Sequence, residues 1–125
     1  MRVYHGTTGE NASRFLAEGI NAHVLHPRSI HGPQDLEPGL FVTPKLSVAR
    51  RFGLFILAIE ANDSNLEAPP ILRQAGVDLE ASLSNPLEPQ ALLKGHVEPE
   101  DISLVESHPN GYPFNPYEDE SNQPA

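Results

Sequence analysis

The sequence predicts a small α+β domain in which a β-sheet is accompanied by two or three short helices. A chain of 125 residues has the size of one domain and can bury a modest core. Short runs rich in β-branched and aromatic residues alternate with segments of helical periodicity. The 13 prolines and 9 glycines indicate that these elements are short and joined by many turns.

The first two elements are a strand and a helix. Residues 2–7, "RVYHGT", alternate apolar and polar side chains, which predicts a strand. In residues 10–20, "ENASRFLAEGI", Ala12 and Phe15 fall on one helical face. The same segment closes with Gly19, a residue suited to the cap after a helix. We therefore expect this helix to follow directly on the strand.

A loop and a second strand–helix unit come next. Residues 21–38 have no sustained period and several prolines, so we expect a long surface loop. "GLFVT" has the composition of a strand and leads into "TPKLSVARRFG". We expect a helix there, with Thr43 as its N-cap, Pro44 in its first position and Gly53 at its end.

The rest of the domain contains the most apolar strand and the closing strands. Residues 54–61, "LFILAIEA", predict a buried strand in the middle of the sheet. Residues 62–86 predict a loop with a short helix at "ILRQAG", and "QALLKGHV" and "ISLVES" predict two closing strands. We expect a domain over residues 1–107 and an acidic, proline-rich flexible tail over residues 108–125.

Charge and composition narrow the classes of function. The net charge of −9 argues against a broad nucleic-acid-binding surface and against an anionic membrane as partner. No signal peptide or membrane span is visible, so we expect a cytoplasmic protein. The absence of cysteine excludes disulfides, thiolate metal sites and a cysteine nucleophile.

Taken in order, the motifs "YHGT", "AEGI" and "GLFVTPKLSVARRFG" resemble the ADP-ribosyltransferase fold family, in particular its poly(ADP-ribose) polymerase-like, histidine-first branch. The resemblance implies a small domain with a split, mainly antiparallel β-sheet, and NAD as the substrate. The matching positions are His5, Gly6, Thr7, Asn11, Gly19, Phe41 and Phe52.

The resemblance also implies a role for each residue. His5 would donate a hydrogen bond to the adenosine ribose, and the backbone of Gly6 would bind the nicotinamide carboxamide. Phe41 and Phe52 would sandwich the nicotinamide ring from the strand and from the following helix. Thr7 and Asn11 would fix the turn and the first helix around this site.

The third motif position departs from the family, which commonly has a Glu there. Alignment on "KGHVEPEDI" puts Gln90 at this position, and its amide brings no negative charge to the developing cation. Glu88 would face the same side of a strand as Gln90, and Pro89 between them favours a bulge or an irregular strand start. Ala49 stands where the family has a serine for the carboxamide.

Each of these residues also has a purely structural interpretation. His5 would then be a strand-end turn residue, Phe41 and Phe52 would be core aromatics, and Asn11 would cap the first helix. Two neighbouring arginines on the second helix, in "SVARRFG", would lie on a solvated face, or approach the NAD pyrophosphate or an acidic surface of a target.

Histidines in the long loop raise the question of a metal site. His23, His26 and His31 lie in a segment rich in proline and glycine, with Asp35 as the carboxylate at ligand spacing. Such a set is more often structural or exposed than metal-binding, so we predict no metal.

Two classes of function remain open. The first is a mono-ADP-ribosyltransferase that cleaves NAD, releases nicotinamide and transfers ADP-ribose to a protein, nucleic acid or small molecule. The second is a catalytically weak or inactive module that binds NAD or ADP-ribose. An RNA 2'-phosphotransferase-like protein is a further alternative because it also has an early "HGT", although that family has a His-x-His strand where this chain has "GLFVTP".

Overall fold

The computed structural model describes residues 1–25 and 38–117. Its first sheet has three strands in the order β1 (Arg2–Thr7), β4 (Phe55–Glu60), β8 (Ile102–Ser107), and both pairs are antiparallel. The apolar segment predicted as the central strand is β4, and it lies in the middle of this sheet, as expected.

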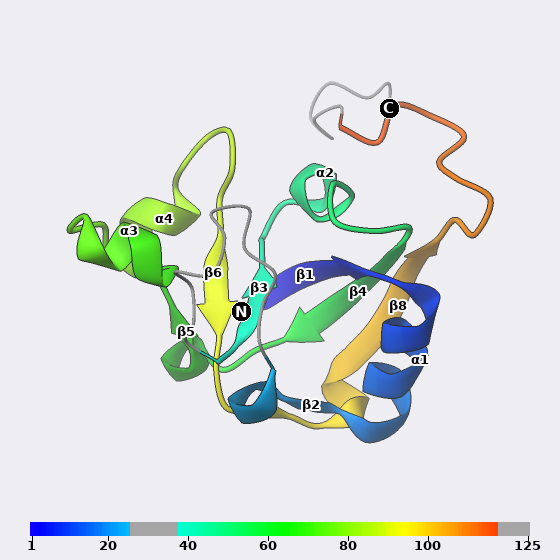
Figure 1. Cartoon of the computed structure of the whole chain (residues 1–125), viewed down its shortest axis with the longest axis horizontal. Coiled ribbons are helices and arrows are strands. Elements are labelled where there is room, and N and C mark those ends of the chain that lie inside the picture. Colours follow the sequence, from blue (N-terminus) through cyan, green and yellow to red (C-terminus); the bar gives the residue numbers. More distant parts are fainter. Residues whose placement is uncertain (26–37, 118–125) are drawn as a thin grey trace.

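The second sheet is also antiparallel and has the order β3 (Leu40–Val42), β6 (Ala91–Leu93), β5 (Leu66–Glu67). Its strands run at a steep angle to those of the first sheet (Figure 1). A two-stranded ribbon is formed by β2 (Ile20–Asn21) and β7 (His96–Val97). The α+β class and the mostly antiparallel sheets are therefore confirmed.

Short helices flank the two sheets: α1 (Gly9–Glu18), α2 (Leu46–Ala49), α3 (Pro70–Gln74) and α4 (Leu79–Leu83). In Figure 1, α1 lies beside β8, α2 lies above β1, and α3 and α4 lie beside the second sheet. The segment from 62 to 86 thus contains two helices and β5 where the sequence predicts one short helix. Short 3₁₀ turns occupy Ala22–Val24, Asp63–Asn65 and Pro99–Asp101.

The first helix is capped by Thr8 and not by Asn11, the residue that the structural interpretation of the sequence assigned to this role. The Thr8 side chain accepts a hydrogen bond from the Asn11 backbone N–H at 3.2 Å, so Asn11 is the capped residue. Gly19 ends the helix as predicted, with φ of 81° and its N–H donating to the Phe15 carbonyl.

The second helix is shorter than predicted, and Thr43 is not its N-cap. Both backbone groups of Thr43 bond to Tyr4, which keeps Thr43 extended and delays the helix to Leu46. The helix ends at Ala49, and the N–H groups of Arg51 and Phe52 donate three residues back, as in a tighter 3₁₀ turn. Gly53 therefore lies beyond the helix, in the turn that leads to β4.

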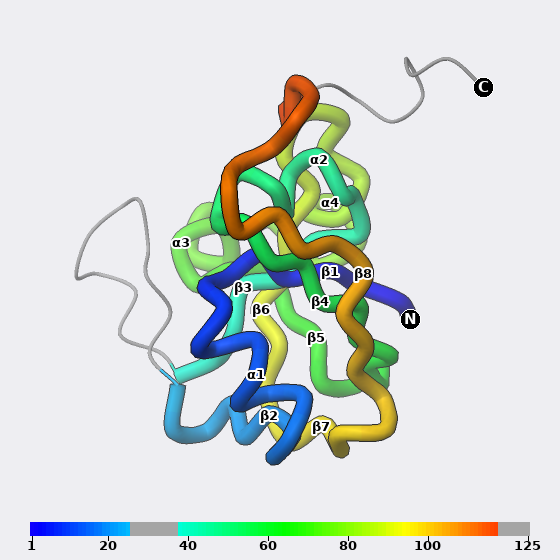
Figure 2. The backbone as a smooth tube through the Cα atoms, turned by 90° about the vertical axis from the view of Figure 1, so that its right-hand side faces the viewer, coloured from blue at the N-terminus to red at the C-terminus, as the bar shows by residue number. Residues whose placement is uncertain are grey.

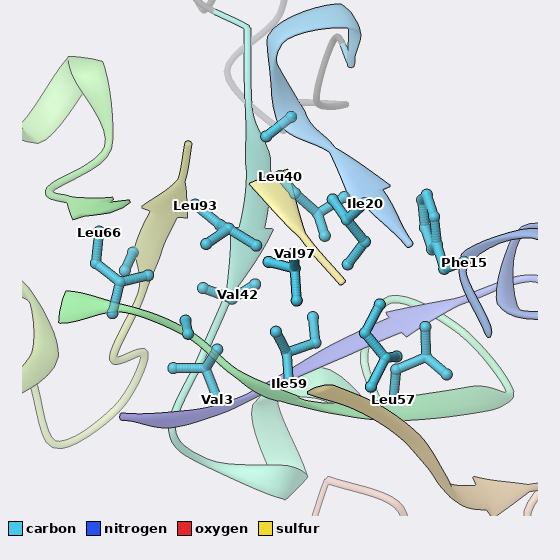
Figure 3. Close-up of a cluster of buried hydrophobic side chains, with 14 of the residues drawn as sticks. Val3, Phe15, Ile20, Leu40, Val42, Leu57, Ile59, Leu66, Leu93 and Val97 are labelled. Carbon is cyan, nitrogen blue, oxygen red and sulfur yellow. The ribbon is translucent and has the colours of Figure 1, made fainter. Parts of the chain in front are cut away.

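The main core lies between the two sheets. It contains Val3, Phe15, Ile20, Leu40, Val42, Leu57, Ile59, Leu66, Leu93 and Val97 (Figure 3). Ile56 and Ala58 alternate with two of these residues on β4, so they face the opposite side. They are nevertheless buried, as are Val48 and Ala49 of α2, so both faces of β4 are covered.

Between β8 and residue 117 the described chain has no helix or strand, but it does not leave the domain at once. The segment predicted as a flexible tail starts at 108, and Figure 2 shows the trace after β8 passing beside the α2 region. Tyr112 is hydrogen-bonded to Gly53 in the turn after α2, and the Phe114 ring lies against Arg50 at the end of α2. Of the predicted long loop, only the two ends belong to the described structure, and residues 26–37 lie outside it. Residues 118–125 also lie outside the described structure. No helix in the described ranges is long and apolar enough to cross a membrane.

Candidate functional site

The two sheets meet where β1 and β3 come together, and in the described structure they pair there through a single bridge. Tyr4 and Thr43 exchange two backbone hydrogen bonds, of 2.7 and 3.0 Å. The next hydrogen-bonded pair in this antiparallel register would be Gly6 opposite Phe41. That pair does not form, so the strands part at this point, which we call the strand split.

His5 takes the place of the missing ladder bond. Its Nδ1 lies 2.8 Å from the Phe41 carbonyl oxygen. A carbonyl only accepts hydrogen bonds, so Nδ1 carries the proton. Burial lowers the pKa of His5 below its ordinary value of 6.5, and the bond to Phe41 offsets this only in part. The ring is therefore neutral, and its Nε2 is an acceptor with no partner among the described residues.

The peptide groups of Gly6 are directed into the strand split. Met1 and Ala61 are hydrogen-bonded to each other, so in the β1–β4 ladder the odd residues of β1 bond to β4. The N–H and C=O of Tyr4 are hydrogen-bonded to Thr43. Gly6 lies two residues further along β1, so its N–H and C=O are directed to the same side, toward β3. Gly6 is buried, yet within the described residues neither group has a hydrogen-bond partner. Buried, unpaired peptide groups are rare.

The glycine itself is required by packing. A Cβ at Gly6 would overlap the carbonyl oxygen of Ala49 in α2. A Cβ at Gly53 would lie 2.5 and 2.6 Å from the N and C atoms of Thr7. Close contact between the end of β1 and the segment after α2 thus accounts for both glycines, whereas the sequence suggested close approach of a ligand to Gly6.

Gln90 lies one residue before β6, the strand that pairs with the strand of Phe41. Phe41 is paired with Leu92, and Gln90 lies two residues from Leu92 along the chain. The Gln90 backbone is held by Ser82, whose hydroxyl donates to the Gln90 carbonyl at 2.6 Å. This fixes the residue just ahead of β6.

Glu88 does not lie on a strand, so the expectation that it faces the same side as Gln90 by strand alternation is wrong. It belongs to the loop before β6, where the Asn85 side chain accepts its backbone N–H at 3.2 Å. Its carboxylate is exposed and lies 2.7 Å from Nη1 of Arg51. Pro89 ends this loop, in agreement with the predicted irregular strand start.

Phe52 and Thr7 are two further residues that the sequence predicts for this site. Phe52 lies in the turn after α2 and is 49% exposed, and no ring contact joins it to Phe41 in the described structure. Thr7 is buried at the end of β1. The structure therefore brings His5, Gly6 and Phe41 into direct proximity and leaves Phe52 on the surface.

The sequence did not reveal the partners of the arginine pair. Arg50 is buried rather than solvated, and it makes a bidentate ion pair with Glu106 at 2.5 and 3.0 Å. Only Arg51 is on the surface as predicted. No sequence signal could identify Glu106, because 56 residues separate it from Arg50.

The metal question concerns mainly residues outside the described ranges. His26, His31 and Asp35 lie there, and His23 is exposed. Among the described residues, no three or more potential ligands gather into a metal-binding group.

Comparisons with known proteins leave the family open. The chain has no significant match to a protein-family model, to a curated protein or to a solved structure.

Proposed function

We propose that this protein binds NAD at the strand split, with the nicotinamide carboxamide on the peptide groups of Gly6. The observation that carries the proposal is the buried, unpaired N–H and C=O of one residue facing the same gap in the ladder of the described structure. A primary carboxamide offers the complementary acceptor and donor side by side, so it would complete both bonds. The position of these groups next to His5 and Phe41 supports the resemblance noted in the sequence.

The protonation of His5 refines its proposed role. Because Nδ1–H is used by the Phe41 carbonyl, Nε2 would accept a hydrogen bond from a ribose hydroxyl rather than donate one. A neutral acceptor suits a hydroxyl donor. We therefore propose that His5 fixes the adenosine ribose while the neighbouring Gly6 fixes the other end of the dinucleotide.

The proposed reaction is mono-ADP-ribosyl transfer. The bond between the ribose C1' and the nicotinamide nitrogen breaks, and its electron pair stays on the ring, so neutral nicotinamide leaves. A nucleophile of the acceptor bonds to C1' and loses a proton. Phe41 and Phe52 would stack on the nicotinamide ring, and the Gln90 amide would hydrogen-bond a ribose hydroxyl. The acceptor is a protein, a nucleic acid or a small molecule.

The second candidate is a module that binds NAD without catalysing a reaction. The surroundings of Glu88, the acidic residue nearest the third motif position, favour this candidate. The Glu88 carboxylate is already paired with Arg51, and the amide of Gln90 adds no charge. Stabilisation of the oxocarbenium-like transition state would then be weak. NAD would bind and remain intact.

Calorimetry with NAD and chromatography of released nicotinamide test both candidates. Binding with release supports the transferase, binding without release supports the module, and no binding contradicts both. Gln90→Glu should create or raise nicotinamide release if the site is intact. Glu88→Gln should abolish release only if Glu88 acts on the ribose. Glu18→Gln, at the exposed end of α1, is the control for loss of one carboxylate.

A further inference from the structure

The segment that carries Phe52 is tied down from β8 and from the residues beyond it. Arg50 pairs with Glu106, the Leu54 carbonyl accepts the His108 N–H at 2.9 Å, and the Gly53 carbonyl accepts the Tyr112 hydroxyl at 2.6 Å. We call residues 108–114 the C-terminal strap. Together these contacts flank Phe52 on both sides in sequence.

A β-bulge directs Glu106 toward Arg50. In the β4–β8 ladder, Leu57 is paired with Leu104 but Ile56 is paired with Glu106, so one residue of β8 is extra. Without it, Glu106 would face the side of the sheet that α1 covers. The bulge moves its carboxylate to the face of Ile56, where α2 lies.

Aromatic rings of the strap complete the enclosure of Arg50. The ring centroid of Phe114 lies 5.0 Å from the guanidinium carbon, and the ring centroids of His108 and Tyr112 are 4.6 Å apart. Burial and the charge of Glu106 raise the pKa of Tyr112, so its hydroxyl stays protonated and donates. The strap is thus a packed element rather than a loose end.

The other side of the same turn rests on β1. Gly53 is packed directly on the backbone of Thr7, so it lies between β1 and the Tyr112 hydroxyl. Phe52 immediately precedes this clamped residue, yet its own ring is half exposed. A side chain with few contacts depends on its backbone for position.

We propose that Tyr112 is a positioning residue: by clamping Gly53 it holds Phe52 where the ring can stack on nicotinamide, and so sets NAD affinity. This inference rests on the proposed function. It assigns to the strap a role in ligand binding without contact with the ligand.

A tryptophan probe at position 52 tests the inference, since the chain has no native tryptophan. Three proteins are compared: Phe52→Trp alone, with Tyr112→Phe, and with Tyr117→Phe as the matched control at an exposed tyrosine beyond the strap. Fluorescence anisotropy reports the mobility of the introduced indole, and quenching by added NAD reports the dissociation constant. Circular dichroism and thermal unfolding report the fold.

We expect Tyr112→Phe to lower the anisotropy of the indole at position 52 and to raise the dissociation constant for NAD about 3- to 10-fold. A change of this size corresponds to the free energy of one hydrogen bond, here the bond from Tyr112 to Gly53. The control should match the parent. Unchanged anisotropy and affinity, even with a lower melting temperature, would make Tyr112 merely structural and overturn the inference.

Failure of the proposed function has a different signature. If NAD quenches none of the proteins and calorimetry of the unmodified chain shows no binding, the proposed function fails and the role in affinity fails with it. Unchanged anisotropy in Tyr112→Phe would then also refute the clamping of position 52. If the double variant does not fold, amide exchange over residues 50–54 in Tyr112→Phe with Phe52 retained decides, and protection equal to that of the unmodified chain overturns the inference.

Discussion

The strand split and the Arg50 cluster, which consists of Arg50, Glu106 and Phe114, lie on opposite sides of the segment after α2. The two regions differ in whether their buried polar groups have partners. At the strand split, the peptide groups of Gly6 are buried without a partner in the described structure. In the Arg50 cluster, a buried cation is enclosed by Glu106 and the C-terminal strap. An unpaired buried polar group costs free energy, so its persistence at the strand split supports the proposed ligand site. The Arg50–Glu106 pair has a partner within the protein and is expected to contribute to stability.

Substitution of Gly6 by Ala should have the largest effect. The new Cβ would overlap the Ala49 carbonyl, and α2 would have to move, at a cost of about 3 kcal/mol in the free energy of unfolding. Urea denaturation measures it. Gly76→Ala is the control, because its Cβ would meet open space and only its φ of 85° is unfavourable. Equal losses in the two variants would mean that α2 does not press on Gly6.

Glu106→Gln should come next, because it removes the charge of the carboxylate that pairs with the buried Arg50. We expect a loss of about 2 kcal/mol, since the Gln side chain retains a hydrogen bond. Glu88→Gln breaks the exposed pair with Arg51 and should cost about 0.5 kcal/mol or less. Urea denaturation of both variants measures the two losses in the free energy of unfolding. Equal losses would mean that the Arg50–Glu106 pair is as weak as the surface pair.

Acidification should lower the free energy of unfolding in two separate pH ranges, one set by His5 and the other by Glu106. Burial lowers the pKa of His5 in the folded protein, so the unfolded chain binds more protons just below 6.5 and stability falls as pH drops from that value. For Glu106 burial alone would raise the pKa, but Arg50 and His108 outweigh it. The net lowering means that this contribution is present above about 4.5 and is lost as pH falls through the folded pKa.

Chemical denaturation between neutral and acidic pH separates these windows. His5→Asn should flatten the stability profile just below 6.5, and Glu106→Gln should flatten the lower part. A His5→Asn profile parallel to that of the unmodified chain would show that His5 titrates normally and is not held neutral by burial.

The last expected effect is on ligand affinity in His5→Asn. The Asn amide can still donate to the Phe41 carbonyl but lacks the Nε2 acceptor, so NAD should bind about 5-fold more weakly, or about 1 kcal/mol, with little change in stability at neutral pH. Calorimetry measures the affinity. Unchanged affinity would remove His5 from the proposed binding site and leave it as the residue that parts β1 from β3.

Local patterns were enough to predict several elements that frame the site. The alternation in "RVYHGT" predicted β1 and put His5 and Gly6 near its end, and the apolar run predicted β4 in the middle of its sheet. Gly19 was recognised as the end of α1 because a positive φ is a local requirement. These features depend on neighbours within a few residues, which the sequence displays directly.

The properties on which the proposed chemistry depends arise from contacts between distant segments. The tautomer of His5 follows from a carbonyl 36 residues away, and the burial of Arg50 follows from a carboxylate 56 residues away. The one-residue bulge that directs Glu106 and the early end of α2 also depend on packing between strands and helix. Hydrogen-bond geometry and burial are properties of the assembled sheets, so residue types and spacing could name His5 and Gly6 but not the direction of their free groups.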